Sequence, residues 1–211
     1  MQEIFQKTAK PERIAELRRA GMLSAASFDD YSSLRAFLPD EGLQPLISHY
    51  WIVRWNIPQD ITYRPTEVLA SPMINIFFMS DEAFLYGLTT QSFEYEARGN
   101  GVMAGATFQP GGFFPYWGQP LASLPAHKSD LKLVFPDASA AFSRRILDKD
   151  DESIAMEIEA LISQRRVTIS PNIATISEIV RAVSLETRLK SVREVSEHFG
   201  IPARTLQHLF Q

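Results

Sequence analysis

Residues 191–211 read SVREVSEHFGIPARTLQHLFQ, and this stretch decides the architecture of the C-terminal part of the chain. Ser191 is followed three residues later by Glu194, a pairing that caps the start of a helix. Gly200 tolerates the left-handed backbone that ends such a helix, and Pro202 suits the first turn of the next one. The stretch therefore predicts two short helices joined by a turn of a few residues, which is the spacing of a helix-turn-helix.

The two helices predicted here each have an apolar face and a polar face. The apolar positions are Val192, Val195, Phe199, Leu206, Leu209 and Phe210. On the opposite face of the second helix lie Arg204, Gln207, His208 and Gln211, spaced i, i+3, i+4 and i+7. Arg pairs in bidentate fashion with guanine, and Gln with adenine, in the major groove of DNA. This polar face is therefore a candidate DNA-reading surface; the alternative is an ordinary helical hairpin with a solvated face.

Upstream, the sequence between residues 46 and 108 is typical of a series of short strands. In the run ISHYWIVRW (47–55), Tyr50 and Ile52 alternate with Trp51, Val53 and Trp55, so the two sets are expected on opposite faces of a sheet. Similar β-prone runs occupy residues 73–79, 82–89, 92–97 and 102–108, with turn residues between them. Several short strands of this kind predict a sandwich or barrel.

Helical patterns flank this β-rich region. Residues 11–23 predict one short helix, and residues 28–38 a second. After Pro136 the texture is helical to the end, with candidate helices at 137–147 and 150–165 and a further one carrying an apolar stripe. That stripe consists of Ile173, Ile176, Val180 and Val183. The polar run RRVTISPN (165–172) is the expected linker.

Composition and charge narrow the class of protein. The 211 residues are 45% hydrophobic and contain no cysteine, which excludes disulfides and Cys-ligated metals. No apolar run approaches the roughly 18 residues of a membrane span, and the charged N-terminus lacks the apolar core of a secretory signal, so a cytoplasmic location is expected. The net charge of −4 divides into −7 over residues 1–164 and +3 over residues 165–211. An acidic body with a basic tail suits a sensor joined to a DNA reader.

The segment VREVSEHFGIPARTLQHLF (192–210) closely resembles the first helix-turn-helix of AraC-family transcription regulators. The runs at 48–55, 73–78, 105–124 and 130–135 resemble a sensor domain found in that family. The resemblance implies an α+β protein: a cupin-like β-barrel or sandwich sensor, a helical linker and a partial helix-turn-helix domain. The expected division is an N-terminal helical extension (1–42), a ligand-sensing domain (43–136), a helical linker or dimerisation region (137–168) and the first helix-turn-helix (169–211).

The same resemblance implies a function. A ligand-responsive regulator would bind double-stranded DNA through Arg204, Gln207 and His208 at base edges, with phosphate contacts from Lys190 and Arg193. The family more often has Ser or Thr at the position of Pro202 and Arg at that of His208. Its DNA-binding domain also continues beyond the position of Gln211 with a second helix-turn-helix, so this chain alone is expected to bind DNA weakly. A homodimer is compatible with this class.

The sensor is expected to bind a small organic effector rather than to catalyse a reaction. No H-x-H or G-x-S-x-G motif is present, so no metal, cofactor or catalytic residue is assigned. Candidate ligand-binding residues are Trp51, Trp55, Phe77, Phe108 and Tyr116, with Arg54 and Gln109 as candidate polar contacts. The carboxylates at 148–152 are interpreted as a solvated helix N-terminus. The alternative function is a small-molecule-binding or enzymatic cupin-like domain whose helical tail serves for dimerisation.

Overall fold

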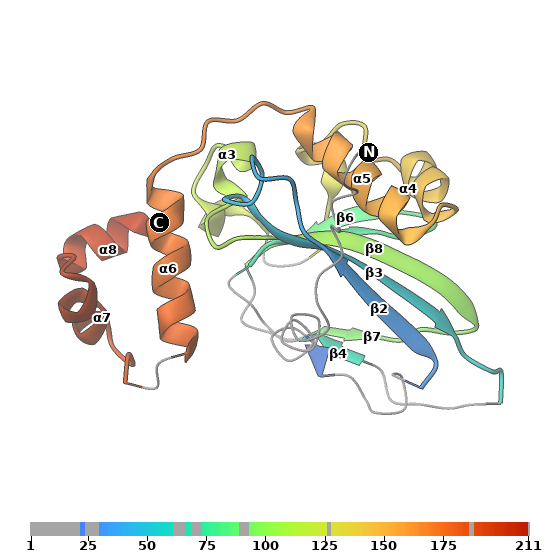
Figure 1. Cartoon of the computed structure of the whole chain (residues 1–211), viewed down its shortest axis with the longest axis horizontal. Helices are drawn as coiled ribbons and strands as arrows, with labels where there is room; N and C mark the ends of the chain where they lie inside the picture. The colour runs from blue at the N-terminus through green and yellow to red at the C-terminus, as the bar shows by residue number, and fades with distance from the viewer. Residues whose placement is uncertain are drawn as a thin grey trace, which may run out of the picture.

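The computed structural model describes residues 22–23, 30–60, 66–68, 73–88, 93–125, 128–185 and 188–210. Over these residues the chain is a mixed α/β protein with a six-stranded antiparallel sheet and six α-helices (Figure 1). The large sheet has the order β2 (Ser32–Phe37), β3 (Ile47–Asn56), β8 (Asn100–Phe108), β5 (Asn75–Phe78), β6 (Ala83–Tyr86) and β9 (Lys128–Asp130). A smaller sheet joins β1 (Met22–Leu23), β4 (Thr66–Val68) and β7 (Phe93–Tyr95).

The long strands β3 and β8 form the centre of the large sheet. They pair from Ile47 opposite Phe108 to Asn56 opposite Asn100, with one irregularity near His49. The alternation predicted for β3 is confirmed: Tyr50 and Ile52 belong to the main hydrophobic core, whereas Val53 and Trp55 belong to a second cluster on the other face. The two faces of the sheet thus have different partners.

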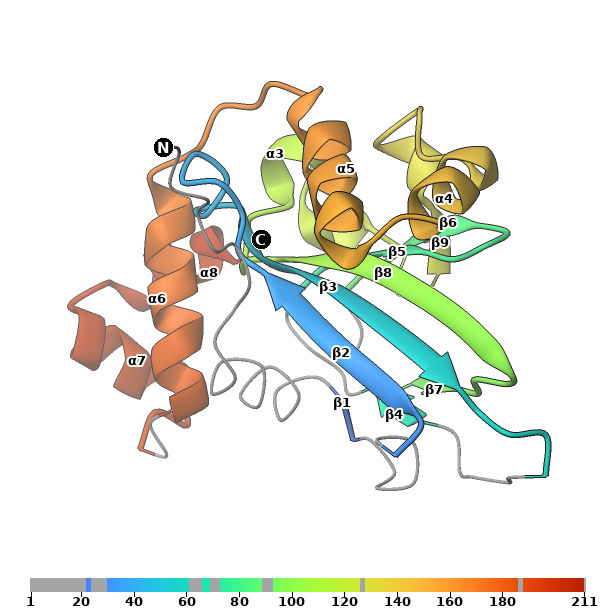
Figure 2. The ribbon, with the colours of Figure 1, turned by 45° about the vertical axis from the view of Figure 1, so that its right-hand side comes forward.

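Helices α4 (Ala140–Leu147) and α5 (Asp151–Ser163) cover one face of the large sheet, and β4 and β7 lie on its other side (Figures 1 and 2). Ile154, Ile158 and Ile162 of α5 are fully buried in the core together with Tyr50 and Ile52. Their i, i+4 spacing places them on one side of the helix. The predicted helices at 137–147 and 150–165 are confirmed as α4 and α5, and both pack on the large sheet.

The N-terminal part of the chain departs from the sequence prediction. The prediction of a short helix within residues 28–38 is wrong. Residues Ser32–Phe37 form strand β2, and every residue of this strand pairs with β3. The helix expected at 11–23 lies outside the described residues, except for Met22–Leu23, which form β1. By contrast, the four β-prone runs between residues 73 and 108 are confirmed as β5, β6, β7 and β8.

Short helical segments connect the last strands. Helix α3 (Phe114–Trp117) follows β8, and two 3-10 turns follow it, η1 (Leu121–Ser123) and η2 (Leu131–Leu133). Helix α3 ends at Gly118, whose φ of 73° is the left-handed backbone favoured by glycine. These segments close one end of the core, where Phe113 and Tyr116 are buried.

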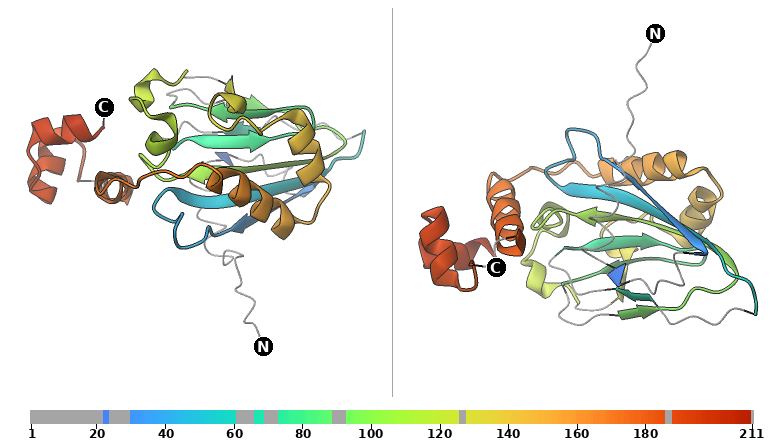
Figure 3. Two further views of the ribbon diagram at one scale, coloured as in Figure 1. Left: turned by 90° about the horizontal axis from the view of Figure 1, so that it is seen from above. Right: turned by 60° about the horizontal axis from the view of Figure 1, so that its bottom comes forward.

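Three helices complete the chain: α6 (Asn172–Leu185), α7 (Val192–Phe199) and α8 (Ala203–Leu209). Residues 166–170 contain no helix or strand, which agrees with the predicted linker. Figures 1 and 3 both show α6 between the large sheet and α7. No helix in the described ranges is long and apolar enough to cross a membrane.

Candidate functional site

The start of α7 is capped as its sequence predicts. The backbone N–H of Glu194 donates to the Ser191 hydroxyl at 3.3 Å, and that hydroxyl donates to Glu194 Oε2 at 2.9 Å. The backbone N–H of Lys190 also donates to Glu194 Oε2, at 2.9 Å. These bonds, the one from Ser191 foremost, lower the pKa of the Glu194 carboxyl, since they stabilise its charged form. The reciprocal bonds fix where the helix begins.

A tight turn joins α7 to α8. Gly200 has φ of 64°, and the Ser196 hydroxyl donates to the carbonyl of Ile201 at 2.6 Å. Pro202 stands at the N-cap of α8 without a side-chain hydrogen bond, because proline has no donor or acceptor to supply there. The turn holds the two helices against each other, with Leu206 of α8 buried.

The predicted apolar contacts of these helices are met only in part. Leu206 is buried, and Val195, Phe199 and Leu209 are half-buried, but Val192 and Phe210 are 53% and 51% exposed. On α6, Ile173 and Ile179 are buried, whereas the predicted stripe member Val183 is exposed. The helical period of the apolar residues predicts which face of a helix is buried. It does not predict which residues of that face the neighbouring helices contact.

The predicted DNA-reading residues share an open surface. Arg204, Gln207 and His208 are all exposed on α8, and Lys190 and Arg193 are exposed at the start of α7. Arg193 pairs with Glu197 at 2.9 Å, one helical turn away. Within the described part of the chain, Arg204 and Gln207 have no hydrogen bond or ion pair through their side chains. Their donors and acceptors therefore face solvent and are available to a partner; Gln211 lies outside the described residues.

Aromatic side chains form a row across the face of the large sheet that lies away from α4 and α5. Trp51 meets Phe77 edge-on, with ring centroids 5.2 Å apart, and Phe77 stacks on Phe84 at 4.8 Å. Tyr86 meets both phenylalanines edge-on at 6.0 Å. We call Trp51, Phe77, Phe84 and Tyr86 the aromatic face. Phe77 and Phe84 are largely buried, but Trp51 and Tyr86 are only half-buried, so the edges of this face are open.

Glycines allow the indoles of Trp51 and Trp55 to pack closely on β8. A Cβ at Gly105 would lie 2.4 Å from Trp51 Cζ2, and one at Gly101 would lie 2.1 Å from Trp55 Cζ2. A side chain at either position would force the indole above it to move, and at Gly105 the Cβ would also lie 2.2 Å from the carbonyl oxygen of Ile76. The Trp55 indole N–H also donates to the carbonyl of Arg98 at 3.3 Å, which fixes its ring.

Polar groups border the aromatic face on two sides. The Thr107 hydroxyl donates to Asn75 Oδ1 at 2.6 Å, beside buried His49, which is paired with Ser48. On β9 the Lys128 ammonium lies 4.4 Å from the centroid of the Phe84 ring and also forms an ion pair with Glu82. An apolar surface with a few placed polar groups at its edge is the usual composition of a small-molecule site.

The five predicted ligand-binding residues do not lie together. Trp51, Trp55 and Phe77 share the face just described, but Phe108 and Tyr116 point into the core on the opposite side of the sheet. There the Phe108 ring packs against Phe113 and Tyr116, at 4.9 and 5.7 Å between centroids. A site on the aromatic face therefore excludes Phe108 and Tyr116, while Phe84 and Tyr86, which the sequence analysis did not select, join it.

Two tyrosine hydroxyls are buried in this core. Within the described residues, the Tyr116 hydroxyl has no hydrogen-bond partner, whereas the Tyr50 hydroxyl lies beside the Glu159 carboxylate. Burial is the main cause that raises both pKa values, to about 12 for Tyr116, and the nearby Glu159 carboxylate raises that of Tyr50 further. Both phenols stay neutral at physiological pH.

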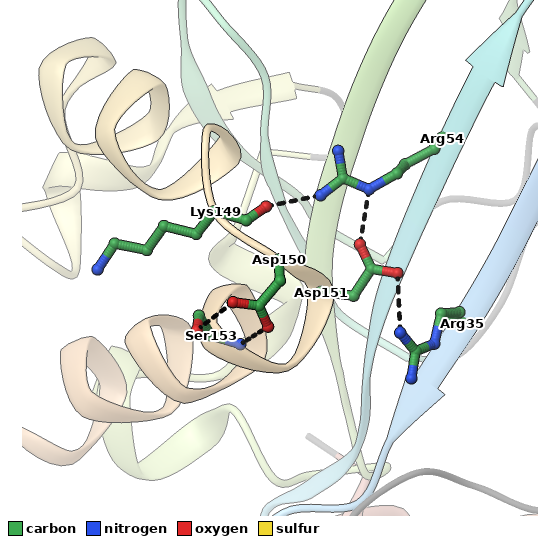
Figure 4. Close-up of polar contacts among 6 residues, drawn as sticks. All are labelled: Arg35, Arg54, Lys149, Asp150, Asp151 and Ser153. Carbon is green, nitrogen blue, oxygen red and sulfur yellow. Dashed lines mark hydrogen bonds and ion pairs between the residues drawn. The ribbon is translucent and has the colours of Figure 1, made fainter.

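A buried carboxylate joins α5 to the sheet (Figure 4). Asp151 accepts from Arg54 Nε at 2.6 Å and pairs with Arg35 at 3.4 Å, and Arg54 also donates to the carbonyl of Lys149 at 2.8 Å. Asp150 caps α5, since its side chain accepts from the backbone N–H of Ser153 at 3.0 Å. The interpretation of residues 148–152 as wholly solvated is thus wrong for Asp151, and Arg54, expected as a ligand contact, instead anchors this helix. Gln109 lies beside the carbonyl of Gln44, at 3.4 Å.

Over the described residues, no group of three or more His, Asp or Glu side chains is placed to hold a metal ion. A family model described as "Domain of unknown function (DUF6597)" matches residues 35–130, which span the large sheet from β2 to β9. No curated protein and no solved structure matched the chain. The matched family thus delimits the β-rich part without assigning its activity.

Proposed function

We propose that this chain is a ligand-responsive transcription regulator resembling the AraC family, in which α7 and α8 act as a helix-turn-helix. The observation that carries the proposal is the exposed polar face of α8. Arg204, Gln207 and His208 lie together on a short helix whose other side holds buried Leu206. A recognition helix needs this division, because one side must pack while the other enters the major groove.

The charges around this face support the proposal. Lys190 and Arg193 are exposed at the start of the neighbouring helix, where phosphate groups would lie if α8 occupied the groove. A tail used only for dimerisation would present mainly apolar residues; Val192 and Phe210 are exposed in this region, but the outer face of α8 carries Arg204, Gln207 and His208.

The β-rich part would serve as the sensor. The smaller sheet lies on the same side of the large sheet as the aromatic face (Figures 1 and 2), which is compatible with a cupin-like arrangement, and we propose that a planar organic effector stacks on the half-buried ring of Trp51. Stacking between aromatic rings contributes about 0.5–1.5 kcal/mol beyond burial. The Asn75–Thr107 pair would then supply polar contacts at one edge of the molecule.

Selection from a random duplex pool tests the DNA proposal. The full chain is incubated with the pool at low salt, where phosphate contacts are strongest, and the bound fraction is sequenced. We expect a short enriched motif, and we expect Arg204→Ala to weaken binding to that motif by roughly 5–150-fold, which corresponds to about 1–3 kcal/mol for one bidentate base contact.

Arg181→Ala is the matched control, because Arg181 is also an exposed helical arginine but lies on α6. It removes the same charge and should leave the motif and its affinity nearly unchanged. If a motif is enriched but Arg204→Ala and Arg181→Ala weaken binding to it equally, α8 does not read bases and the proposal is wrong.

A further inference from the structure

Helix α6 contacts both the sensor and the α7–α8 pair. Ile173 at its start is 2% exposed and belongs to the main core of the large sheet. One turn later the Ser177 hydroxyl donates to the carbonyl of Pro110 at 3.3 Å. A Cβ placed on Gly111 would lie 3.3 Å from Ile176 Cδ1, so this side chain packs directly on the glycine backbone. Further along the same helix, Ile179 is buried and α6 contacts α7.

The loop that receives α6, residues 109–112, is continuous with the aromatic face. It follows Phe108, the last residue of β8, and Gly105 of that same strand lies directly beneath Trp51. The loop itself is held firmly, because the N–H of Gln109 donates to the carbonyl of Leu46 and the N–H of Gly112 to that of Gln109, both at 2.8 Å. A shift of the end of β8 therefore moves the surface on which α6 rests.

We propose that α6 is a coupling helix whose docking on residues 110–111 transmits the state of the aromatic face to α7 and α8. The proposal rests on the proposed function, since it assigns the route from effector to DNA. Docked α6 leaves Arg204 and Gln207 exposed. The contact therefore acts by fixing the orientation of α8 rather than by covering its reading face.

An engineered disulfide tests whether this docking holds in solution. The natural chain has no cysteine, and the Cβ position of Gly111 lies 3.8 Å from Ile176 Cβ, which is a usual spacing for a disulfide. The Gly111→Cys/Ile176→Cys chain should bridge under mild oxidation, read as the loss of both free thiols in the monomer. Gly111→Cys/Val183→Cys is the control; it carries the same strain at Gly111, where φ is 76°, and should not bridge.

The rate of bridging then measures coupling to the aromatic face. In the bridging background, Trp51→Ala should change that rate by about fivefold or more, as expected for two coupled sites. Leu133→Ala removes an exposed side chain of η2 and should leave the rate unchanged. Circular dichroism checks that each variant folds, and Trp51→Phe replaces Trp51→Ala if the latter does not.

Failure of Gly111→Cys/Ile176→Cys to bridge, or equal bridging in the control pair, would show that α6 does not dock at this loop. Equal rates in the Trp51 and Leu133 variants would show that docking is independent of the aromatic face. Neither readout uses DNA, so a failure here leaves the duplex selection informative, and a failure of that selection leaves this test intact.

Discussion

Replacing Asp151 with Asn should destabilise the protein by about 2 kcal/mol, between the cost of breaking a buried ion pair (about 3–5 kcal/mol) and that of an exposed one (about 0–1 kcal/mol). The structure sets this intermediate value. The Asp151 side chain is only 11% exposed, but the side chains of its partners Arg54 and Arg35 are 39% and 48% exposed. Water therefore screens part of the interaction and can solvate both arginines once the carboxylate is gone.

Thermal unfolding followed by circular dichroism measures this effect. For a chain of this size, about 2 kcal/mol corresponds to a fall in Tm of roughly 4–8 °C. Glu152→Gln is the matched control, since Glu152 is the next residue in the first turn of α5 but is exposed. It removes the same charge from the helix N-terminus, where a carboxylate contributes about 0.3–1 kcal/mol. Equal shifts for Asp151→Asn and Glu152→Gln would refute the reasoning, because the arginine contacts would then contribute nothing.

Four further outcomes are expected. Gly105→Ala should cost at least about 1–3 kcal/mol, since its Cβ would lie 2.2 Å from the carbonyl oxygen of Ile76, whereas Gly42→Ala meets nothing within 4 Å and should unfold like the parent protein in urea. Hydrogen bonds from Arg145 and then Lys149 lower the pKa of Glu157 from 4.5 to about 2. The ionised Glu157 carboxylate therefore stabilises the fold above pH 4.5, and this stabilisation is lost as the pH falls toward 2. In urea titrations between pH 4.5 and 2, Glu157→Gln should lose less stability than the parent protein does. Gln207→Ala should relax base preference at one position of a selected duplex, while Lys190→Ala should weaken all duplexes alike in anisotropy titrations. A planar aromatic probe that is not itself fluorescent, such as nitrobenzene, should quench the fluorescence of the parent chain and lose that effect in Trp51→Phe but not in Trp117→Phe.

Local sequence patterns predicted most of the individual strands and helices, but not how they assemble. The alternation along β3 placed Tyr50 and Trp51 on opposite faces because strands have a period of two, and the Ser191–Glu194 pair marked the start of α7 because capping is a local interaction. Strand β2 was missed because its sequence, SSLRAF, lacks β-branched residues. It is held in the sheet by its pairing with β3.

The candidate sites depend on relations that no local pattern contains. Asp151 and Arg54 are 97 positions apart, so nothing near Asp151 in the sequence indicates that it is buried. Similarly, the alternation of side chains along β8 shows that Phe108 and Gly105 lie on opposite faces of the sheet. Only the pairing of β8 with β3, in which Gly105 lies opposite Trp51, shows which of the two shares the face of Trp51. Which residues of different strands share a face of the sheet can therefore be assigned only once the strand pairing is known.

The glycines beneath the two indoles also bear on how the chain finds this pairing. Trp51 lies opposite Gly105 and Trp55 opposite Gly101, so the spacing of the tryptophans on β3 matches the spacing of the glycines on β8. A slip by one residue would exchange the two faces, and a slip by two would preserve them but place Met103 beneath one of the indoles in either direction. The paired indoles and glycines thus fix the register of the two central strands, since hydrophobic patterning alone would also allow the alignments shifted by two residues.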